Sequence, residues 1–150
     1  MDRTCVALAL AIVCAPLAHA DDVTWTSATG VSVSGNDLTK TGTDGAWNSG
    51  AISTVQLDWG PAYVEATASE TTTYRTFGLS KGSADNSNTD IDFGLYMAAS
   101  GTLYVYESGG NKYTGTYATN DRLRVEAEPG VVRYLRDVGL DVEGLFVHAT

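Results

Sequence analysis

Tyrosine is the residue type whose number and spacing in this sequence point most directly to binding chemistry. Tyr96, Tyr104 and Tyr106 fall at alternate positions of short apolar runs, and Tyr113 lies in a stretch rich in glycine and threonine. Sugars stack on aromatic rings, and polar groups beside the rings hydrogen-bond the sugar hydroxyls. Five residues are therefore expected to contact a carbohydrate ligand: Tyr96, Tyr104, Tyr106, Tyr113 and Asp92. In the alternative interpretation, the tyrosines pair across strands and only stabilise a sheet.

A polar segment over residues 85–92 has a spacing that suits a calcium ion. Asp85, Asn88 and Asp90 supply side-chain oxygen atoms at close intervals, and calcium takes about six to eight oxygen ligands. The segment lacks the glycine and the terminal glutamate of an EF-hand loop. It predicts either a calcium site at these three residues or a polar turn whose side chains accept backbone hydrogen bonds. No other cofactor is expected.

Two pairs of acids have a separation that a glycosidase can use. Asp90 and Asp92 lie two residues apart, as do Glu126 and Glu128, and this spacing spans roughly 7 Å on a strand. Glycoside hydrolysis uses two carboxylates roughly 5–9.5 Å apart. Neither pair belongs to a recognisable catalytic motif. We therefore expect solvated or hydrogen-bonded acids and no enzyme, with glycan cleavage as the less favoured alternative.

Cysteine and histidine are too scarce for most nucleophilic and metal chemistry. Both cysteines, Cys5 and Cys14, lie within the first 20 residues, and the two histidines are His19 and His148. The sequence therefore offers too few histidines for a histidine-rich zinc site and only His19 and His148 for a Ser-His-Asp triad. The formal net charge of −9 argues against binding to nucleic acid, because phosphate recognition needs basic patches.

The first 20 residues have the pattern of a secretory signal peptide. Arg3 is followed by an apolar run over residues 6–17 and by the cleavage pattern Ala18-His19-Ala20, as in secretory signals. The apolar run is shorter than the ~20 residues that a membrane-spanning helix needs. We expect cleavage after Ala20, a secreted single domain over residues 21–150, and no transmembrane segment.

Strands rather than helices must position these side chains, because apolar and polar residues alternate repeatedly along the chain. The alternation occurs at residues 63–68, 91–97, 103–106, 122–127 and 131–136. It places Tyr96, Tyr104 and Tyr106 on a solvent-facing side. Clusters of turn-forming residues separate the runs, and Glu128-Pro129-Gly130-Val131 predicts a tight hairpin. This pattern predicts an all-β antiparallel β-sandwich or jelly roll.

Several stretches follow one another in the order found in a known family. They are VTWTSATGVSVSGNDLTKT (23–41), ASETTTYRTFGLSKG (68–82), TDIDFGLYM (89–97), LYVYESG (103–109) and GTYATNDRLRV (115–125). Together they resemble bacterial secreted and cell-surface β-sandwich modules of the concanavalin A-like, SPRY-like type. The resemblance covers roughly residues 23–135 and implies a concanavalin A-like jelly roll. It implies no settled reaction, because one fold hosts many functions.

The tail departs from the pattern of this family. The family continues with further strands that complete the sandwich, whereas residues 137–144 break the alternation here. Leu145-Phe146-Val147 is the one apolar run that follows. We expect a truncated sandwich or a short substitute strand at this run. A sheet edge left open would favour pairing with another chain.

These observations together predict a secreted, non-catalytic module that recognises a carbohydrate or another cell-surface component. The alternative is a structural or adhesive extracellular domain without a small ligand, and a glycan-cleaving enzyme is less favoured. A contiguous, exposed aromatic patch beside acids would favour the carbohydrate-binding module. Dispersed or buried rings would favour the structural domain, and two carboxylates facing each other across a groove would favour the enzyme.

Overall fold

The structure is a computed structural model of the chain, and it describes residues 21–43, 45–57, 60–82, 85, 87–138 and 141–149. The predicted signal peptide lies outside the described residues. Within them, the regular structure consists of strands and one three-residue 3-10 helix, Asn88–Asp90. None of the helical structure in these ranges is long and apolar enough to cross a membrane.

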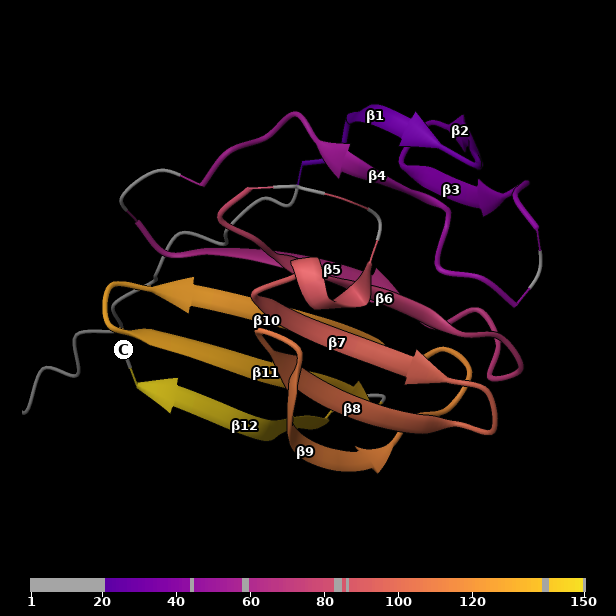
Figure 1. The fold of residues 1–150 in the computed structure, drawn as a ribbon. Coiled ribbons are helices and arrows are strands. Elements are labelled where there is room, and N and C mark those ends of the chain that lie inside the picture. The colour runs from indigo at the N-terminus through magenta and orange to yellow at the C-terminus, as the bar shows by residue number, and fades with distance from the viewer. Residues whose placement is uncertain are drawn as a thin grey trace, which may run out of the picture.

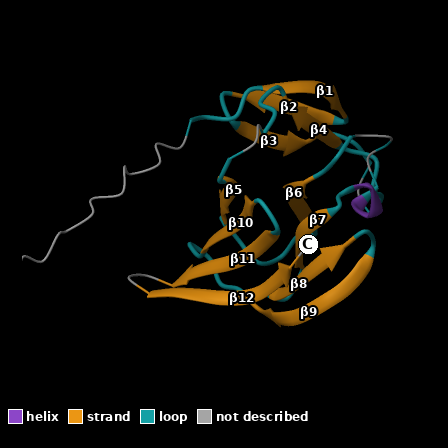
Figure 2. Ribbon diagram, turned by 90° about the vertical axis from the view of Figure 1, so that its left-hand side faces the viewer, coloured by secondary structure: helices purple, strands orange, loops and turns teal. Residues whose placement is uncertain are grey.

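Two four-stranded antiparallel sheets form the main body and pack face to face (Figure 1; Figure 2). The back sheet has the order β12–β11–β10–β5 and contains β5 (Ala62–Thr67), β10 (Arg122–Glu128), β11 (Val131–Val138) and β12 (Asp141–Ala149). The front sheet has the order β6–β7–β8–β9 and contains β6 (Arg75–Leu79), β7 (Phe93–Ala98), β8 (Thr102–Glu107) and β9 (Gly110–Thr116). The predicted all-β antiparallel architecture is confirmed.

Four short strands form a separate N-terminal unit, residues 25–53, above the β5 and β6 edge of the main body (Figure 1). In this unit β1 (Trp25–Thr29) pairs with β4 (Gly50–Ser53), and β2 (Val31–Ser34) pairs with β3 (Asp37–Lys40). Trp25 is half-buried, and its Nε1 donates a hydrogen bond to the carbonyl oxygen of Asn36 at 2.9 Å. Among the described strands, none of the N-terminal unit pairs with a strand of either main sheet.

The core between the two sheets follows the alternation of the sequence. Its fully buried members come from both layers: Leu95, Leu103 and Val105 from the front sheet, and Leu123, Val125 and Tyr134 from the back sheet. Burying one such side chain contributes about 1.5–3 kcal/mol. Since successive side chains of a strand point to opposite faces, the residues that alternate with this core on β7 and β8 point outward.

One hydrogen bond between side chains crosses the buried space between the sheets. The Tyr134 hydroxyl on β11 donates to Oε1 of Glu107 on β8 at 3.0 Å, and Glu107 is only 7% exposed. Burial raises the pKa of Tyr134, and the negative charge of Glu107 and the hydrogen bond to it act in the same direction. Buried polar groups are costly unless they are paired, so each member of this pair satisfies the other.

The C-terminal strand forms more of the sheet than the sequence suggests. The predicted hairpin at residues 128–131 joins β10 to β11, with Gly130 at φ +84°. After it, β12 pairs with β11 from Val138↔Asp141 to Val131↔Ala149, with one register shift near Tyr134. Residues 141–149 therefore form a nine-residue strand instead of only a short run at 145–147. Among the described strands, β12 has a partner on one side alone, so its other edge is open.

Candidate functional site

Three of the predicted ligand-binding tyrosines lie side by side on the outward side of the front sheet. Tyr96 on β7 is paired directly with Tyr104 on β8, and Tyr106 follows two residues later on β8, opposite Gly94. Their neighbours Leu95, Leu103 and Val105 are fully buried, which leaves the three tyrosines half-buried on the opposite side. The alternation of the sequence therefore predicted their shared face correctly.

Tyr96 is the centre of this group. Its ring centroid lies 5.6 Å from that of Tyr104 at an interplanar angle of 23°, and 5.8 Å from that of Tyr106 at 83°. Tyr104 and Tyr106 also contact each other, at 5.9 Å and 67°. Offset-stacked and edge-to-face arrangements at these distances are the favourable geometries of aromatic pairs.

Two rings that are not among the five predicted contacts complete the group. Tyr74, just before β6, stacks on Tyr96 at 6.1 Å and 17°, and Trp47, in the loop between β3 and β4, contacts Tyr96 at 5.5 Å and 53°. Tyr74 is 62% exposed and Trp47 is 43% exposed. We call these five contiguous rings the aromatic face: Trp47, Tyr74, Tyr96, Tyr104 and Tyr106.

The phenol hydroxyls of the aromatic face differ from those of the buried tyrosines. Tyr117 donates to the carbonyl oxygen of Ala98 at 3.1 Å, and Tyr134 donates to Glu107. In the described part of the chain, no hydrogen bond joins the hydroxyl of Tyr74, Tyr96, Tyr104 or Tyr106 to another residue. These four hydroxyls can therefore hydrogen-bond a ligand without breaking a bond within the protein.

The surroundings of Tyr96 favour the neutral form of its phenol. Burial raises the pKa of Tyr96, and the neighbouring phenols of Tyr74, Tyr106 and Tyr104 raise it further. A neutral phenol both donates and accepts a hydrogen bond. The centre of the aromatic face therefore offers both functions at neutral pH, which suits a ligand that carries hydroxyl groups.

A hydrogen-bonded loop before β6 holds Tyr74 in position. The Glu70 carboxylate accepts hydrogen bonds from Thr72 and from the Thr73 hydroxyl, and it forms an ion pair of 2.6 Å with Nη2 of Arg75. Hydrogen bonds from Thr72 and Thr73 lower the pKa of Glu70 to about 2. The ion pair attaches Arg75, the residue after Tyr74, to the same loop.

Asp92 and Tyr113 do not join the aromatic face directly. Oδ2 of Asp92 accepts a hydrogen bond from the Lys81 amide at 2.8 Å, and its carbonyl oxygen accepts one from the Ser108 amide at 2.9 Å. Tyr113 is paired with Val105 and packs against the core. Asp92 thus supports the loops next to the face, and Tyr113 lies on the opposite side of the sheet from the predicted ligand.

The three residues predicted to bind calcium lie in or next to the 3-10 helix. Asp85 accepts a hydrogen bond from the Ser87 amide at 2.6 Å, and Ser87 caps the helix Asn88–Asp90. The described residues contain no group of three or more histidine, cysteine or acidic side chains arranged to hold a metal ion. The Asp85 side chain forms the polar turn that was the alternative, while calcium binding at Asp85, Asn88 and Asp90 stays a prediction.

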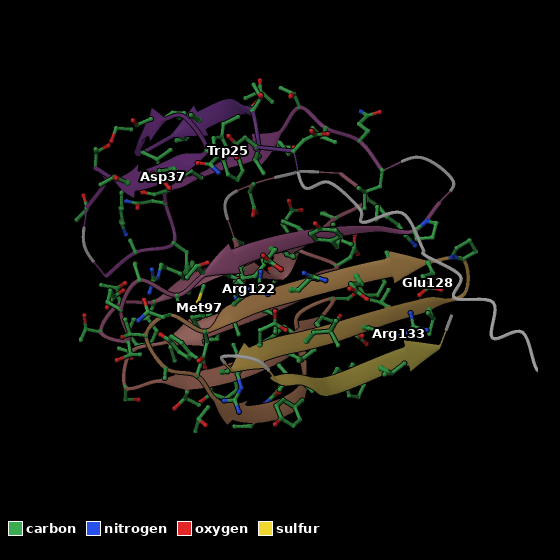
Figure 3. The ribbon with its side chains drawn as sticks, turned by 180° about the vertical axis from the view of Figure 1, so that it is seen from behind. Trp25, Asp37, Met97, Arg122, Glu128 and Arg133 are labelled. Carbon is green, nitrogen blue, oxygen red and sulfur yellow. The ribbon has the colours of Figure 1, made fainter. Side chains whose placement is uncertain are left out.

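The two acid pairs are placed differently from the strand geometry assumed for them. Asp90 ends the 3-10 helix and Asp92 precedes β7, so they do not share one strand face as expected. Glu126 and Glu128 do share the outward side of β10, where Glu126 forms an ion pair of 3.0 Å with Arg124 and Glu128 forms one with Arg133. Figure 3 shows Arg122, Glu128 and Arg133 on this charged back face.

Arg124 links several groups of the same back face. Its Nη2 lies 2.6 Å from Oε2 of Glu65, and its guanidinium lies 4.4 Å from the centre of the Tyr63 ring. Arg122 pairs with Asp137 nearby. The acids predicted as candidates for catalysis on β10 therefore act as partners of arginines. A shallow pocket of about 540 Å³ lies at the β10–β11 hairpin. Among its described lining residues Glu128 is the one carboxylate, whereas glycoside hydrolysis uses two.

Comparison with known proteins gives no match: no protein family, no curated protein and no solved structure matches this chain. The predicted membership of a concanavalin A-like, SPRY-like family therefore stays a prediction. A function has to be inferred from the chemistry of the aromatic face itself, because fold class alone does not determine function.

Proposed function

We propose that this protein is a non-catalytic module that binds a carbohydrate through the aromatic face. The observation that carries this proposal is the combination of five contiguous rings with four phenol hydroxyls that make no hydrogen bond to a described residue. Sugars present apolar C–H faces and many hydroxyl groups, and binding sites commonly combine apolar walls with a few polar groups. Both kinds of contact are offered here by the same side chains.

The angles between the rings favour one form of carbohydrate. Trp47 is tilted by 53° and Tyr106 by 83° from the plane of Tyr96, so the rings do not share one plane. A flat crystalline polysaccharide would contact coplanar rings best. The aromatic face therefore suits a single glycan chain that can follow an uneven surface.

The proposed setting of this function is extracellular, and the proposed fold is the concanavalin A-like jelly roll. The predicted signal peptide supports secretion, and the two facing antiparallel sheets provide the two layers of a jelly roll, with strands that mostly follow one another as meanders. The net charge of −9 disfavours anionic ligands through long-range repulsion. We therefore propose a neutral glycan or another uncharged cell-surface component as the ligand.

A structural or adhesive domain is the second candidate function, and one observation favours it. Tyr96, Tyr104 and Tyr106 are half-buried, and Trp47 brings the N-terminal unit into contact with Tyr96. Rings arranged in this way also stabilise a sheet and attach one part of the chain to another. The two candidates predict different results with a free glycan chain. The carbohydrate-binding module binds the chain at the outward surfaces of Tyr74 and Tyr104, whereas the structural domain does not.

The two candidates are separated by a glycan-array screen of the protein without its signal peptide, followed by calorimetry on the best ligand. We expect Tyr74→Ala and Tyr104→Ala each to weaken binding by about tenfold, which corresponds to about 1.4 kcal/mol. Tyr63→Ala is the matched control, since it removes a half-buried tyrosine from the opposite sheet beside Arg124. This control should bind the glycan as the wild type does.

Running the screen with calcium and with a chelator tests the metal prediction in the same experiment. Binding in both conditions would restrict the role of Asp85, Asn88 and Asp90 to the polar turn. Binding that disappears with the chelator would support the calcium site. A screen without any bound glycan in either condition would rule out the carbohydrate-binding module, and shortened products on chromatography would favour the enzyme.

A further inference from the structure

Trp47 is the one ring of the aromatic face that the N-terminal unit supplies. It lies in the loop between β3 and β4, whereas the other four rings lie on β7, β8 or just before β6. The N-terminal unit sits above the edge of the main body (Figure 1; Figure 2) and shares no strand pairing with it. The position of the indole on the aromatic face therefore depends on the local structure of residues 25–53.

The loop that carries Trp47 is folded around the carbonyl group of Gly30. The amides of Thr41 and Gly42 both donate to the carbonyl oxygen of Gly30, at 2.8 and 2.9 Å. Lys40 is the last residue of β3, and its Nζ donates a hydrogen bond to the carbonyl oxygen of Ala46, the residue before Trp47, at 2.7 Å. These hydrogen bonds fix the chain immediately before Trp47.

Gly30 is in direct steric contact with the residues that follow Trp47. Its φ is +61°, and a Cβ atom added there would lie 2.9 Å from the carbonyl oxygen of Asn48 and 2.5 Å from Oγ of Ser49. The Ser49 hydroxyl can rotate away, but the Asn48 carbonyl is backbone and can move only with the chain around it. Since Asn48 is adjacent to Trp47, a side chain at position 30 would displace the indole.

We propose that Trp47 selects the shape of glycan that the aromatic face accepts, and that Gly30 is the positioning residue that holds Trp47 in place. This inference rests on the proposed carbohydrate binding. Because the indole is tilted by 53° from Tyr96, a chain that contacts both rings has to turn between them. A curved, neutral glycan such as an α-1,4-linked glucan contacts both. An extended β-1,4-linked glucan contacts only Tyr96 and the two rings nearly parallel to it, Tyr74 and Tyr104.

Gly35 provides a matched control for the test of Gly30. Its φ is +59°, and a Cβ atom added there would have no heavy atom within 4 Å. Gly30→Ala and Gly35→Ala therefore both place alanine in the left-handed region, at a similar cost in backbone strain. Only Gly30→Ala also displaces Asn48. A difference between the two variants thus reports the contact with the Trp47 loop.

The first measurement needs no ligand. Nuclear Overhauser contacts between the Trp47 indole and the Tyr96 ring should be present in the wild type, lost in Gly30→Ala and kept in Gly35→Ala. Thermal melts of the two variants show whether both remain folded. If Gly30→Ala does not, Gly30→Asn replaces it, because asparagine tolerates a positive φ and carries the same Cβ atom. Contacts that persist in folded Gly30→Ala would overturn the positioning role.

The second measurement compares maltohexaose with cellohexaose by calorimetry. We expect Trp47→Ala and Gly30→Ala to weaken binding of the curved α-1,4-linked chain by about tenfold and to leave the extended chain unchanged. Gly35→Ala should match the wild type with both. Equal losses of affinity for maltohexaose and cellohexaose would overturn the proposed role of Trp47 in selecting glycan shape, but not the proposed carbohydrate binding. If neither chain nor any arrayed glycan binds, the proposed function fails, and the ligand-free measurement still decides the role of Gly30.

Discussion

At the scale of single residues, Tyr134 and Tyr96 show two contrasting surroundings of a tyrosine in this protein. Tyr134 is fully buried and its hydroxyl has a charged acceptor, Glu107, on the facing sheet. Tyr96 is half-buried, and its neighbours are other aromatic rings. Both phenols have a raised pKa because burial disfavours the phenolate. The first kind stabilises the fold, whereas the second leaves polar groups for a partner.

Tyr134→Phe should destabilise the protein, because it removes the hydrogen bond that Glu107 accepts in a buried position. We expect a loss of about 1.5–3 kcal/mol, the range for hydrogen bonds to charged groups, measured by urea denaturation at pH 7. The loss should shrink in alkali. The folded state holds the Tyr134 proton more tightly than the unfolded state, so this contribution is full below pH ~10 and falls as the pH rises beyond it.

Tyr117→Phe is the control for this prediction, since Tyr117 is also buried but donates to the neutral carbonyl group of Ala98. Its loss should be about 0.5–1.5 kcal/mol, as for an ordinary hydrogen bond. Equal losses in the two variants would show that the Tyr134–Glu107 hydrogen bond contributes no more to the free energy of unfolding than an ordinary hydrogen bond.

At the scale of elements, the strands that bury one side were predictable and the details of their pairing were not. The alternation at 91–97 and 103–106 fixes which residues of β7 and β8 face the core, because a slip of one residue would expose that whole set. Tyr113 was placed by composition instead, in a stretch rich in glycine and threonine, and the structure places it in β9. The pairing of β8 with β9 shifts between Val105 and Tyr106, and a bulge of this kind leaves no clear signal in one sequence.

The two rings outside the five predicted contacts come from loops. Trp47 is 49 residues away from Tyr96 along the chain, and the hydrogen bonds that fold its loop around Gly30 have no periodic pattern. Tyr74 lies next to an arginine whose partner, Glu70, is local. Contacts between distant loops and a sheet depend on the whole tertiary arrangement, so local pattern could predict the tyrosines of β7 and β8 but not the complete aromatic face.

The open edge of β12 is an element whose consequence is testable. Unpaired backbone groups along an exposed strand favour pairing with a second chain, and Val147 on β12 is 56% exposed. We expect concentration-dependent self-association in sedimentation velocity experiments, and Val147→Lys should reduce it, since an edge lysine opposes such pairing. Val33→Lys, at a 46% exposed valine of β2, should leave association unchanged. A wild-type protein that stays monomeric at all concentrations would contradict the prediction.

At the scale of the whole molecule, the N-terminal unit and the main body should differ in stability. The strands β1–β4 contain four or five residues each and have mainly exposed or half-buried side chains, whereas β7, β8 and β10 contribute the buried core. Local opening requires less free energy where few apolar side chains are buried. The N-terminal unit should therefore open without unfolding of the main body.

Native-state hydrogen exchange followed by mass spectrometry tests this difference. Amides of residues 25–53 should exchange with a lower opening free energy than those of β7 and β8. A bound glycan that contacts Trp47 should raise the protection of residues 25–53 in the wild type and not in Trp47→Ala. Uniform protection along the chain would show that the two parts open together.

The two outward surfaces of the sandwich are chemically opposite, and this has a consequence for how many copies work together. One surface carries rings and hydroxyls, whereas the other carries paired arginines and acids, among them Glu128 and Arg133 (Figure 3). A copy whose rings contact a polysaccharide has its ionic surface exposed to solvent. Since each copy also carries a net charge of −9, electrostatic repulsion opposes the binding of a second copy on top of the first. If the proposed carbohydrate binding holds, the protein should therefore coat a polymer as a single layer.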